Sequence, residues 1–396
     1  MHKTAIVIGG GIAGCTTAHA LAKRGMQVTM IEQHARLGQE ASGNPSAMLY
    51  PRLSGDDALS RFALAAFLHS LDFYQTLNLP ANTFNACGMC QLGFNARELN
   101  RIQKVASVYQ AVDGLQFVNA FEASQLAGVE LHFDALYVSC AGWVKPNALL
   151  AHLSQQHNIS TIKLTKVNNI LKYNNIFKIS IGENKSLEAD MVVIANANDA
   201  QYFSQSSHIV TQAVRGQVSL LPDTPSSQAL KTIICSDGYL SPSIDGIHSL
   251  GATFSTENLS LKAILEDHQA NLKSLKNWST PLYDSLKKQP ISGRASLRCT
   301  APDYFPLVGQ LLDAESLSKN PPRPNADKES LPWIEGLFIN VAHGSRGFTS
   351  APLCAELLAQ MMVGEPLALS AELAGQLNPN RFLMRKLGLK RLSKIV

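Results

Sequence analysis

The stretch Thr4-Ala-Ile-Val-Ile-Gly9 runs directly into Gly9-Gly-Gly-Ile-Ala-Gly14, and the next apolar run, Val28-Thr-Met-Ile31, ends on Glu32. This order predicts a buried strand, a glycine turn, a helix from Ile12 to Arg24 and a second strand that closes on an acid. Such a strand-turn-helix-strand unit is typical of the first half of a parallel α/β sheet.

Each glycine of the turn has a separate predicted task. Gly9 permits the tight turn, Gly11 lets backbone amides approach a diphosphate, and Gly14 lets the helix pack closely against the sheet. The first helical residues, Ile12 and Ala13, carry amides without intrahelical acceptors, so the positive end of the helix dipole faces the phosphates.

Glu32 follows the turn at close to the spacing of about 20 residues at which a carboxylate accepts hydrogen bonds from the hydroxyls of a ribose. With strands, helix and acid in register, the segment predicts a bound dinucleotide. In the alternative interpretation the glycines serve only packing.

Length and composition indicate an ordered globular protein. A chain of 396 residues predicts two domains, or one large domain with an inserted partner, and the hydrophobic content of 45% and charged content of 16% are typical of folded proteins. The seven scattered cysteines do not suggest a disulfide framework, so a reducing cytoplasm is expected. Neither a signal peptide nor a membrane span is expected, because every apolar run is short.

Hydrophobic patterns along the chain predict further elements. A helical period covers Ser54–Leu77, and the continuous apolar run Asp190–Ala195 predicts a central parallel strand. The segments Val214–Leu221 and Ile247–Ala252 lie in a region with few helix signals, which predicts a mixed, largely antiparallel sheet. The polar, proline-rich stretch 313–332 is predicted to be an exposed loop.

A second strand-turn-helix unit occurs late in the chain. Leu337–Ala342 reads as a strand, His343–Gly347 as a glycine turn, and Ala351–Met362 as a helix. The N-terminus of this helix would again attract negative charge. The alternative is an ordinary crossover helix.

The C-terminal segment is basic. After Glu372 the chain contains no acid, and Asn378-Pro379 is a plausible helix start. Such a tail is able to bind phosphates, or else it is a solvated basic helix. Its cationic residues are Arg381, Arg385, Lys386, Lys390, Arg391 and Lys394.

Further motifs point to a family. They are Glu40-Ala-Ser-Gly-Asn44, Val214-Arg-Gly-Gln217, Gly238-Tyr-Leu-Ser-Pro242, Leu297-Arg-Cys-Thr-Ala-Pro-Asp303 and His343-Gly-Ser-Arg-Gly-Phe348. Together with the first glycine turn, they resemble the D-amino-acid-oxidase and glycine-oxidase superfamily of FAD enzymes.

This resemblance implies an α/β fold with a Rossmann-like FAD-binding domain and an inserted, mainly antiparallel α+β substrate domain of the D-amino-acid-oxidase type. Residues 1–85, 141–200 and 293–396 are assigned to the FAD-binding domain. Residues 86–140 and 201–292 are assigned to the substrate domain.

The resemblance and the glycine motifs together predict FAD as the cofactor and no metal. The predicted FAD-binding residues are Gly9, Gly11, Ile12, Ala13, Gly14, Glu32, Ser42, Gly43, Asn44, Val167, Ala195, Asn196, Gly344, Ser345, Arg346, Gly347 and Phe348.

A narrower resemblance rests on Ala41–Pro51, Cys235–Tyr239, Ser350–Glu356 and Leu377–Arg381. These segments are similar to the oxidoreductase half of the bifunctional enzymes of tRNA methylaminomethyl-thiouridine biosynthesis. The resemblance implies oxidation of a carboxymethylaminomethyl group on the wobble uridine, with release of glyoxylate. In those enzymes a methyltransferase half comes first, whereas Met1 stands just before the first strand here, so a separate methyltransferase is a candidate partner.

Three side chains are predicted to be catalytic. By the resemblance, Arg298 holds the substrate carboxylate and Tyr239 adds a hydrogen bond, and a guanidinium binds a carboxylate through two parallel bonds. Arg346 would stabilise the reduced flavin. The structural alternatives are an ion pair of Arg298 with Asp303, a buried core role for Tyr239, and a carboxylate partner elsewhere for Arg346. His343 either touches the flavin or is structural.

Other interpretations remain open at this level. Cys87-Gly-Met-Cys90 has metal-site spacing but no second pair, so packing is favoured. An oxidase of free glycine, sarcosine or a D-amino acid would share the fold and the arginine that holds the substrate carboxylate. A non-catalytic flavin-binding tRNA scaffold and an NAD-dependent dehydrogenase are further alternatives. Binding of a tRNA substrate requires contacts to the phosphates around the reacting base, and the basic C-terminal segment is able to provide them.

Overall fold

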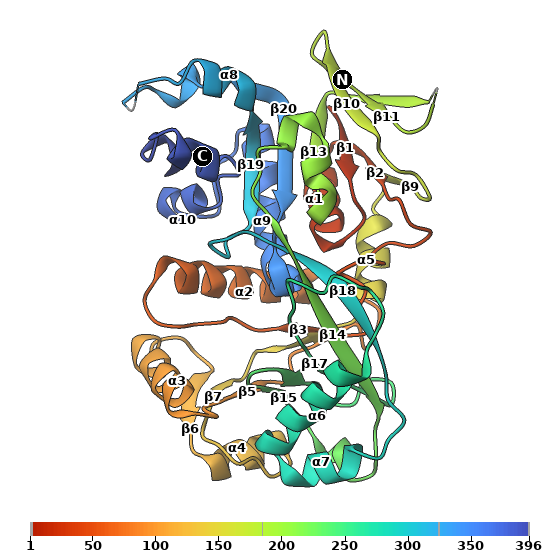
Figure 1. The fold of residues 1–396 in the computed structure, drawn as a ribbon, viewed down its shortest axis with the longest axis vertical. Helices are drawn as coiled ribbons and strands as arrows, with labels where there is room; N and C mark the ends of the chain where they lie inside the picture. Colours follow the sequence, from red (N-terminus) through yellow and green to blue (C-terminus); the bar gives the residue numbers. More distant parts are fainter. Residues whose placement is uncertain (1–2, 184, 324, 395–396) are drawn as a thin grey trace. The chain divides into compact units, whose positions relative to one another are not determined.

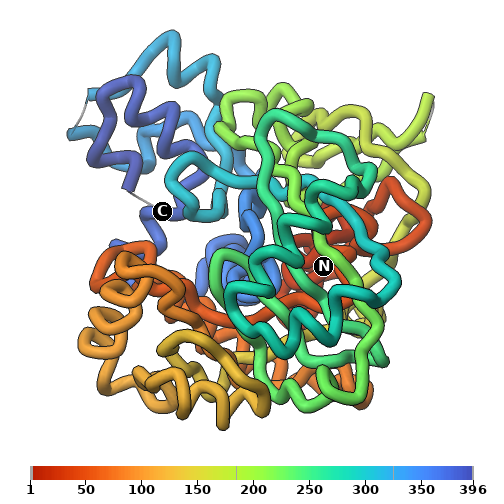
Figure 2. Tube along the Cα trace, turned by 60° about the horizontal axis from the view of Figure 1, so that its bottom comes forward, coloured from red at the N-terminus to blue at the C-terminus, as the bar shows by residue number. Residues whose placement is uncertain are grey.

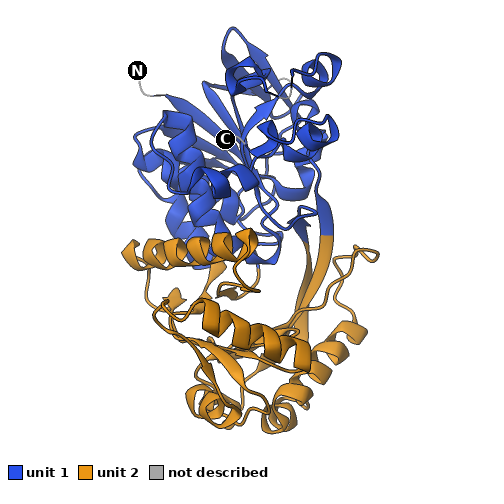
Figure 3. Cartoon of the chain, turned by 90° about the vertical axis from the view of Figure 1, so that its left-hand side faces the viewer, with its two compact units in different colours: residues 1–43, 147–213, 298–396 blue, residues 44–146, 214–297 orange. Residues whose placement is uncertain are grey.

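The computed structural model describes residues 3–183, 185–323 and 325–394. The chain forms two compact units, each built from segments that are far apart in the sequence (Figure 3). It passes from one unit to the other four times, and the residue colours of Figure 2 allow its path to be followed. Unit 1 contains residues 1–43, 147–213 and 298–396, and unit 2 contains residues 44–146 and 214–297.

These boundaries differ from the predicted domain boundaries. Residues 44–85, assigned above to the first domain, group with unit 2, because helix α2 (Ala58–Thr76) packs Phe67 and Leu71 into a core of that unit. Residues 201–213 group instead with unit 1, where Phe203 belongs to the main core.

Unit 1 is built on a six-stranded sheet (Figure 1). Its central strands are parallel and in register, with Ile6 beside Val192 on one side and beside Thr29 on the other. The apolar run Asp190–Ala195 therefore does form a central parallel strand, as predicted. The order is β19 (Leu307–Leu312), β20 (Trp333–Val341), β13 (Met191–Ile194), β1 (Thr4–Ile8), β2 (Gln27–Ile31) and β9 (Ile159–Ile162), with β19 antiparallel to β20.

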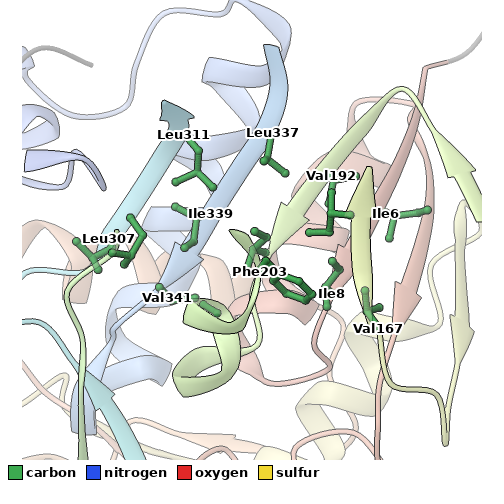
Figure 4. Close-up of a cluster of buried hydrophobic side chains, with 14 of the residues drawn as sticks. Ile6, Ile8, Val167, Val192, Phe203, Leu307, Leu311, Leu337, Ile339 and Val341 are labelled. Atoms are coloured by element: carbon green, nitrogen blue, oxygen red, sulfur yellow. The ribbon is translucent and has the colours of Figure 1, made fainter. Parts of the chain in front are cut away.

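Apolar side chains cover one face of this sheet. Alternate residues of a strand point to the same face, so Ile6 and Ile8 of β1 meet Val192 of β13 and Ile339 of β20 in one cluster (Figure 4). The cluster is completed by Phe177 and its neighbours in a three-stranded sheet. That sheet contains β10 (Asn169–Tyr173), β11 (Ile176–Ser180) and β12 (Ser186–Ala189).

Two helices that begin at glycine turns pack against each other in unit 1. Helix α1 (Ile12–Lys23) follows β1, and helix α9 (Gly347–Val363) follows β20. Both predicted strand-turn-helix units are therefore present. Helix α5 (Pro146–Ser154) leads into β9.

The stretch 313–332 is not wholly irregular, so that prediction is partly wrong. It contains helix α8 (Ala314–Lys319), which is capped by the Asp313 carboxylate accepting from the Ser316 amide at 3.0 Å. This N-cap was a readable signal in the sequence. Helices α10 (Ala371–Gln376) and α11 (Arg381–Lys386) complete the unit.

Unit 2 contains a mixed, largely antiparallel sheet, as predicted. β15 and β5 are parallel, whereas β15 pairs antiparallel with β16. Its order is β18 (Ser292–Thr300), β14 (Gln212–Pro222), β17 (Ile247–Gly251), β16 (Tyr239–Leu240), β15 (Ile233–Cys235), β5 (Met89–Leu92), β7 (Ala135–Val138) and β6 (Leu115–Val118).

Helices and a small sheet complete unit 2. The helices are α2, α3 (Ala96–Val108), α4 (Ala120–Ala127), α6 (Leu265–Trp278) and α7 (Thr280–Leu286). The small sheet contains β3 (Ala47–Leu49), β8 (Gly142–Val144) and β4 (Phe84–Asn85). Within the described ranges, no helix is both long and apolar enough to cross a bilayer.

Candidate active site

The first glycine turn is required by close backbone approaches. Gly9 has a φ of 112°, and a Cβ atom there would lie 2.6 Å from the Ala195 carbonyl oxygen at the end of β13. A Cβ atom at Gly14 would lie 1.9 Å from the carbonyl oxygen of Gly9. Larger residues at either position would push α1 away from the sheet, which agrees with the tight turn predicted at Gly9 and the close packing predicted at Gly14.

The start of helix α1 leaves room for an anion. The Ile12 amide donates to Ser42 Oγ at 3.0 Å. The N-cap residue is Gly11, which has no side chain to cap the other amides of the first turn. A Cβ at Gly11 would meet only that hydroxyl, at 3.2 Å, among the described residues outside its chain neighbours. The first-turn amides of a helix have no intrahelical acceptors, so this open edge suits a diphosphate.

Glu32 is buried with its carboxylate held by backbone amides. One oxygen accepts from the Gly10 amide at 2.7 Å, and the other accepts from the His34 amide at 2.8 Å. Each carboxylate oxygen retains a further lone pair that can accept from a ribose hydroxyl. Gly10, which the sequence interpretation did not single out, is therefore part of the site, and a Cβ there would lie 2.8 Å from Glu32 Oε2.

The second glycine turn lies against the first. It consists of a short helical turn, Gly344–Arg346, which leads directly into α9. A Cβ at Gly347 would lie 3.0 Å from Ile12 Cγ2, so the two helix starts meet within unit 1. The main predicted cofactor-binding segments are thereby brought together, although they are more than 300 residues apart in the chain.

His343 has a structural role. Its Nδ1 lies 2.9 Å from Ser350 Oγ, and its Nε2 lies 2.9 Å from Asn340 Oδ1. Asn340 in turn donates to Thr17 Oγ1 at 3.0 Å, which links β20, the turn, α9 and α1. Burial lowers the pKa of His343 to about 4, so the imidazole is neutral near pH 7.

Two buried polar atoms in this region fit a cofactor. Asn196 Oδ1 and Arg346 Nε are buried, and neither has a hydrogen-bond partner among the residues that the structure describes. Orphaned buried polar atoms are costly unless a bound group satisfies them. Asn196 follows strand β13 and Arg346 follows strand β20, and both are predicted FAD-binding residues. The polar groups of a bound dinucleotide would satisfy these two atoms, so the residues present fit such a cofactor.

Two other predicted FAD contacts, Val167 and Asn44, belong to different units. Val167 is buried in the core of unit 1, two residues after Thr165, whose amide donates to the Glu32 carbonyl. Asn44 is the first residue of unit 2, and its Oδ1 accepts from Arg294 at 2.8 Å.

The proposed substrate clamp, Arg298, lies near the end of strand β18 and is buried, with an exposed fraction of 9%. Two residues further along the strand, Thr300 forms a bridge with His343. A Cβ at Gly344 would lie 3.2 Å from Thr300 Cγ2. Since residues i and i+2 of a strand point the same way, Arg298 lies on the side of β18 that meets the second glycine turn.

Tyr239 belongs to unit 2, in strand β16, where it pairs with Cys235 and with Gly251. It is half-buried and packs against a core cluster of that unit.

The carboxylate of Asp303, a possible ion-pair partner of Arg298 in the sequence analysis, forms an ion pair with Arg381. Arg381 donates to it twice, at 2.6 and 2.9 Å, and is completely buried. The prediction that Arg381 belongs to a phosphate-binding tail is therefore wrong. Arg385 lies 3.6 Å from the same carboxylate, and Lys386, Lys390 and Lys394 are exposed.

The Cys87 and Cys90 thiols are ordinary packing groups in this structure. Burial raises the pKa of each to about 11, which keeps them protonated. Among the described residues, no three histidine, cysteine or acidic side chains are grouped to hold a metal.

Two glycine turns at paired helix starts, a buried carboxylate and a buried arginine are the arrangement expected of a dinucleotide-dependent oxidoreductase. A family described as FAD dependent oxidoreductase matches residues 4–361. The chain belongs to this family.

Comparison with individual proteins agrees with that assignment. The chain is 46% identical to the tRNA 5-methylaminomethyl-2-thiouridine biosynthesis bifunctional protein of Methylobacillus flagellatus, covering 98% of this chain and 60% of the relative. It is 38% identical to the protein of the same name from Pseudomonas aeruginosa, with the same coverage. The chain thus spans about three fifths of the length of these relatives.

Solved structures show the same fold. Glycine oxidase from Geobacillus kaustophilus has a TM-score of 0.76 at 18% identity, covering 95% of this chain and 98% of that chain. L-proline dehydrogenase from P. horikoshii has a TM-score of 0.77 at 18% identity, covering 96% and 98%. The predicted D-amino-acid-oxidase type of fold is confirmed.

Proposed function

We propose that this protein oxidises the carboxymethylaminomethyl group on the wobble uridine of tRNA, releases glyoxylate and leaves an aminomethyl uridine. The observation that carries the proposal is the 46% identity, along 98% of the chain, to a tRNA 5-methylaminomethyl-2-thiouridine biosynthesis protein. The buried Arg298 beside the second glycine turn supports it, because the substituent is an N-substituted glycine with a carboxylate to bind.

The FAD of this family would be held by the residues of unit 1. The start of helix α1 at Ile12 would face the diphosphate, and Glu32 would accept hydrogen bonds from the ribose. The unpartnered side-chain atoms of Asn196 and Arg346 would form hydrogen bonds with the cofactor. When bound, FAD supplies a two-electron acceptor for the hydride that leaves the glycyl carbon. Neutral His343 holds the second turn in place through its two protein partners.

The chain's own task in the reaction is orientation. Arg298 would bind the carboxylate through two parallel bonds, which fixes the direction of the reacting C–H bond and saves the entropy of aligning it. Tyr239 would add a hydrogen bond to that carboxylate. Loss of a hydride and the amine proton turns the C–N bond into an imine, and water then splits the imine into glyoxylate and the aminomethyl uridine.

Unit 1 would thus be the FAD-binding unit and would also supply Arg298, and unit 2, which contains Tyr239, is the proposed substrate unit. The relatives are bifunctional, so the proposed product is a substrate for methylation, and a methyltransferase is a proposed partner. A tRNA substrate supports the cytoplasm as the proposed location of the reaction.

Mass spectrometry of wobble nucleosides tests this function. We expect the purified holoenzyme to convert the carboxymethylaminomethyl uridine of bulk tRNA into the aminomethyl form, with glyoxylate in equal amount. Free glycine and sarcosine should remain unreacted. Oxidation of the free amino acids without any change in tRNA would show instead an amino-acid oxidase, and an unreduced flavin with both substrates would show a non-catalytic binder.

The exposed lysines of the C-terminal segment are expected to contact tRNA phosphates. Changing Lys386, Lys390 and Lys394 together to glutamine should weaken tRNA binding and reduce the steepness of its salt dependence by roughly 2, since each lost phosphate contact removes about 0.7 to 0.9 from the slope. Binding titrations at several salt concentrations measure this. An unchanged slope would show that the lysines form only a solvated surface.

A further inference from the structure

The loop between β18 and β19 contains an exposed tyrosine, Tyr304, in an unusual backbone conformation. Tyr304 has a φ of 62°, and 71% of the residue is exposed. A residue with a Cβ atom is strained in this left-handed region, and for a bulky aromatic residue it is an outlier. The Tyr304 ring has no hydrogen bond or ring contact with the part of the chain that the structure describes.

Hydrogen bonds from a buried arginine hold the loop around Tyr304 in place. The Tyr304 amide donates to the Ala301 carbonyl at 3.0 Å. Buried Arg381 binds both oxygens of Asp303 and also donates to the Phe305 carbonyl at 2.9 Å. The residues on both sides of Tyr304 are thus fixed by one guanidinium, so the ring is presented to solvent on a preorganised support. Rigid presentation lowers the entropy cost of binding a partner.

Positive charge is gathered at Asp303, the residue before Tyr304 in this loop. Two guanidinium groups, those of Arg381 and Arg385, face the single carboxylate of Asp303, which leaves an excess positive charge. The Arg385 side chain is 36% exposed, and Lys386 next to it is exposed. An aromatic ring next to solvent-accessible cations is the combination that binds unpaired nucleotides, since the ring stacks on a base and the cations bind phosphate.

The same loop continues directly from the candidate active site. Arg298 and Thr300 precede it on β18, and Thr300 bridges to His343 at the second glycine turn. All of these residues belong to unit 1. An RNA loop whose wobble base reacts near Arg298 would have neighbouring bases within reach of this edge of the unit.

We propose that Tyr304 is a stacking site for an unpaired nucleobase next to the wobble position of the substrate RNA. This inference rests on the proposed function and adds a specific recognition residue to it. A base within a duplex is already stacked on both faces, so the site selects a single-stranded loop. The strained backbone positions the ring for this contact.

The test uses the full-length holoenzyme and an anticodon stem-loop RNA with a fluorescent purine analogue beside the wobble uridine. Changing Tyr304 to glycine should raise the Kd on the order of tenfold, as loss of one stacked base predicts, and should abolish quenching of the analogue. Tyr304→Phe should bind as the parent does, because stacking does not need the hydroxyl. The salt slope should stay the same in both variants, since no charge changes.

Two controls separate stacking from folding. Glycine accepts a φ of 62°, so Tyr304→Gly should unfold at the same temperature as the parent or higher. Tyr173, which is 75% exposed in the β10–β11 hairpin of the same unit, provides a matched control, and Tyr173→Ala should leave binding unchanged.

Equal Kd values for the parent and Tyr304→Gly would overturn the inference while leaving the proposed function intact. A parent protein that neither binds nor oxidises the stem-loop would instead contradict the proposed function itself. Equal binding of a duplex RNA and the stem-loop, with no quenching, would show that only phosphates are recognised.

Discussion

Replacing Arg298 with alanine should lower kcat/KM for modified tRNA by about 100-fold or more while the purified protein keeps its FAD. Removing one partner of a buried charge pair costs about 2–5 kcal/mol or more, and the loss falls on the reacting geometry. FAD retention is expected because the first glycine turn and Glu32 are held by other groups: Ile12 by Ser42, and Glu32 by the amides of Gly10 and His34. Steady-state kinetics and the visible flavin spectrum measure the two effects.

Arg298→Lys is the informative companion variant. Lysine keeps the positive charge but has no planar fork, so it should restore part of the rate and none of the two-bond geometry. Binding of tRNA should change little in either variant, because the many phosphate contacts are elsewhere. A rate equal to that of the parent in Arg298→Ala would remove this residue from the proposed mechanism.

Replacing Arg381 with alanine should lower the free energy of unfolding by about 3–5 kcal/mol, the usual cost of leaving one member of a buried ion pair alone. The guanidinium is completely buried and binds Asp303 as well as the carbonyls of Pro306 and Phe305. Urea unfolding followed by circular dichroism measures the loss.

Arg385→Ala is the matched control for this prediction. Arg385 lies on the same helix and near the same carboxylate, but its side chain is 36% exposed and the distance is 3.6 Å. A screened pair of this kind contributes about 0–1 kcal/mol, so the control should unfold almost as the parent does. Equal stability of the two variants would contradict a structural role for Arg381.

The two arginines also show where sequence interpretation stopped. Both stand in an acid-free C-terminal stretch, and their local sequence does not distinguish them. Asp303 is 78 residues earlier than Arg381, and only the folded chain brings the two together. An ion pair between such distant residues leaves no periodic pattern in the sequence, so Arg381 was grouped wrongly with the exposed lysines.

The domain boundaries have the same explanation. Helix α2 was predicted from its apolar period, but that period shows only that one face is buried. The core that buries Phe67 and Leu71 also contains Ile102 and Val138, which come from later segments. Membership in unit 2 therefore depends on long-range packing.

By itself, the sequence determined the strand-turn-helix units, the glycines of the first turn and the acid that follows the second strand, Glu32. Strand and helix periods, the positive φ of Gly9 and the approach of Gly14 to Gly9 are local, because they act over a few residues. The contact that a Cβ at Gly9 would make with Ala195 is tertiary. Only the tertiary structure decided that His343 links four elements, that Arg381 is a buried support and that Tyr304 is displayed to solvent. Those outcomes depend on which distant groups meet, and short-range sequence patterns do not encode them.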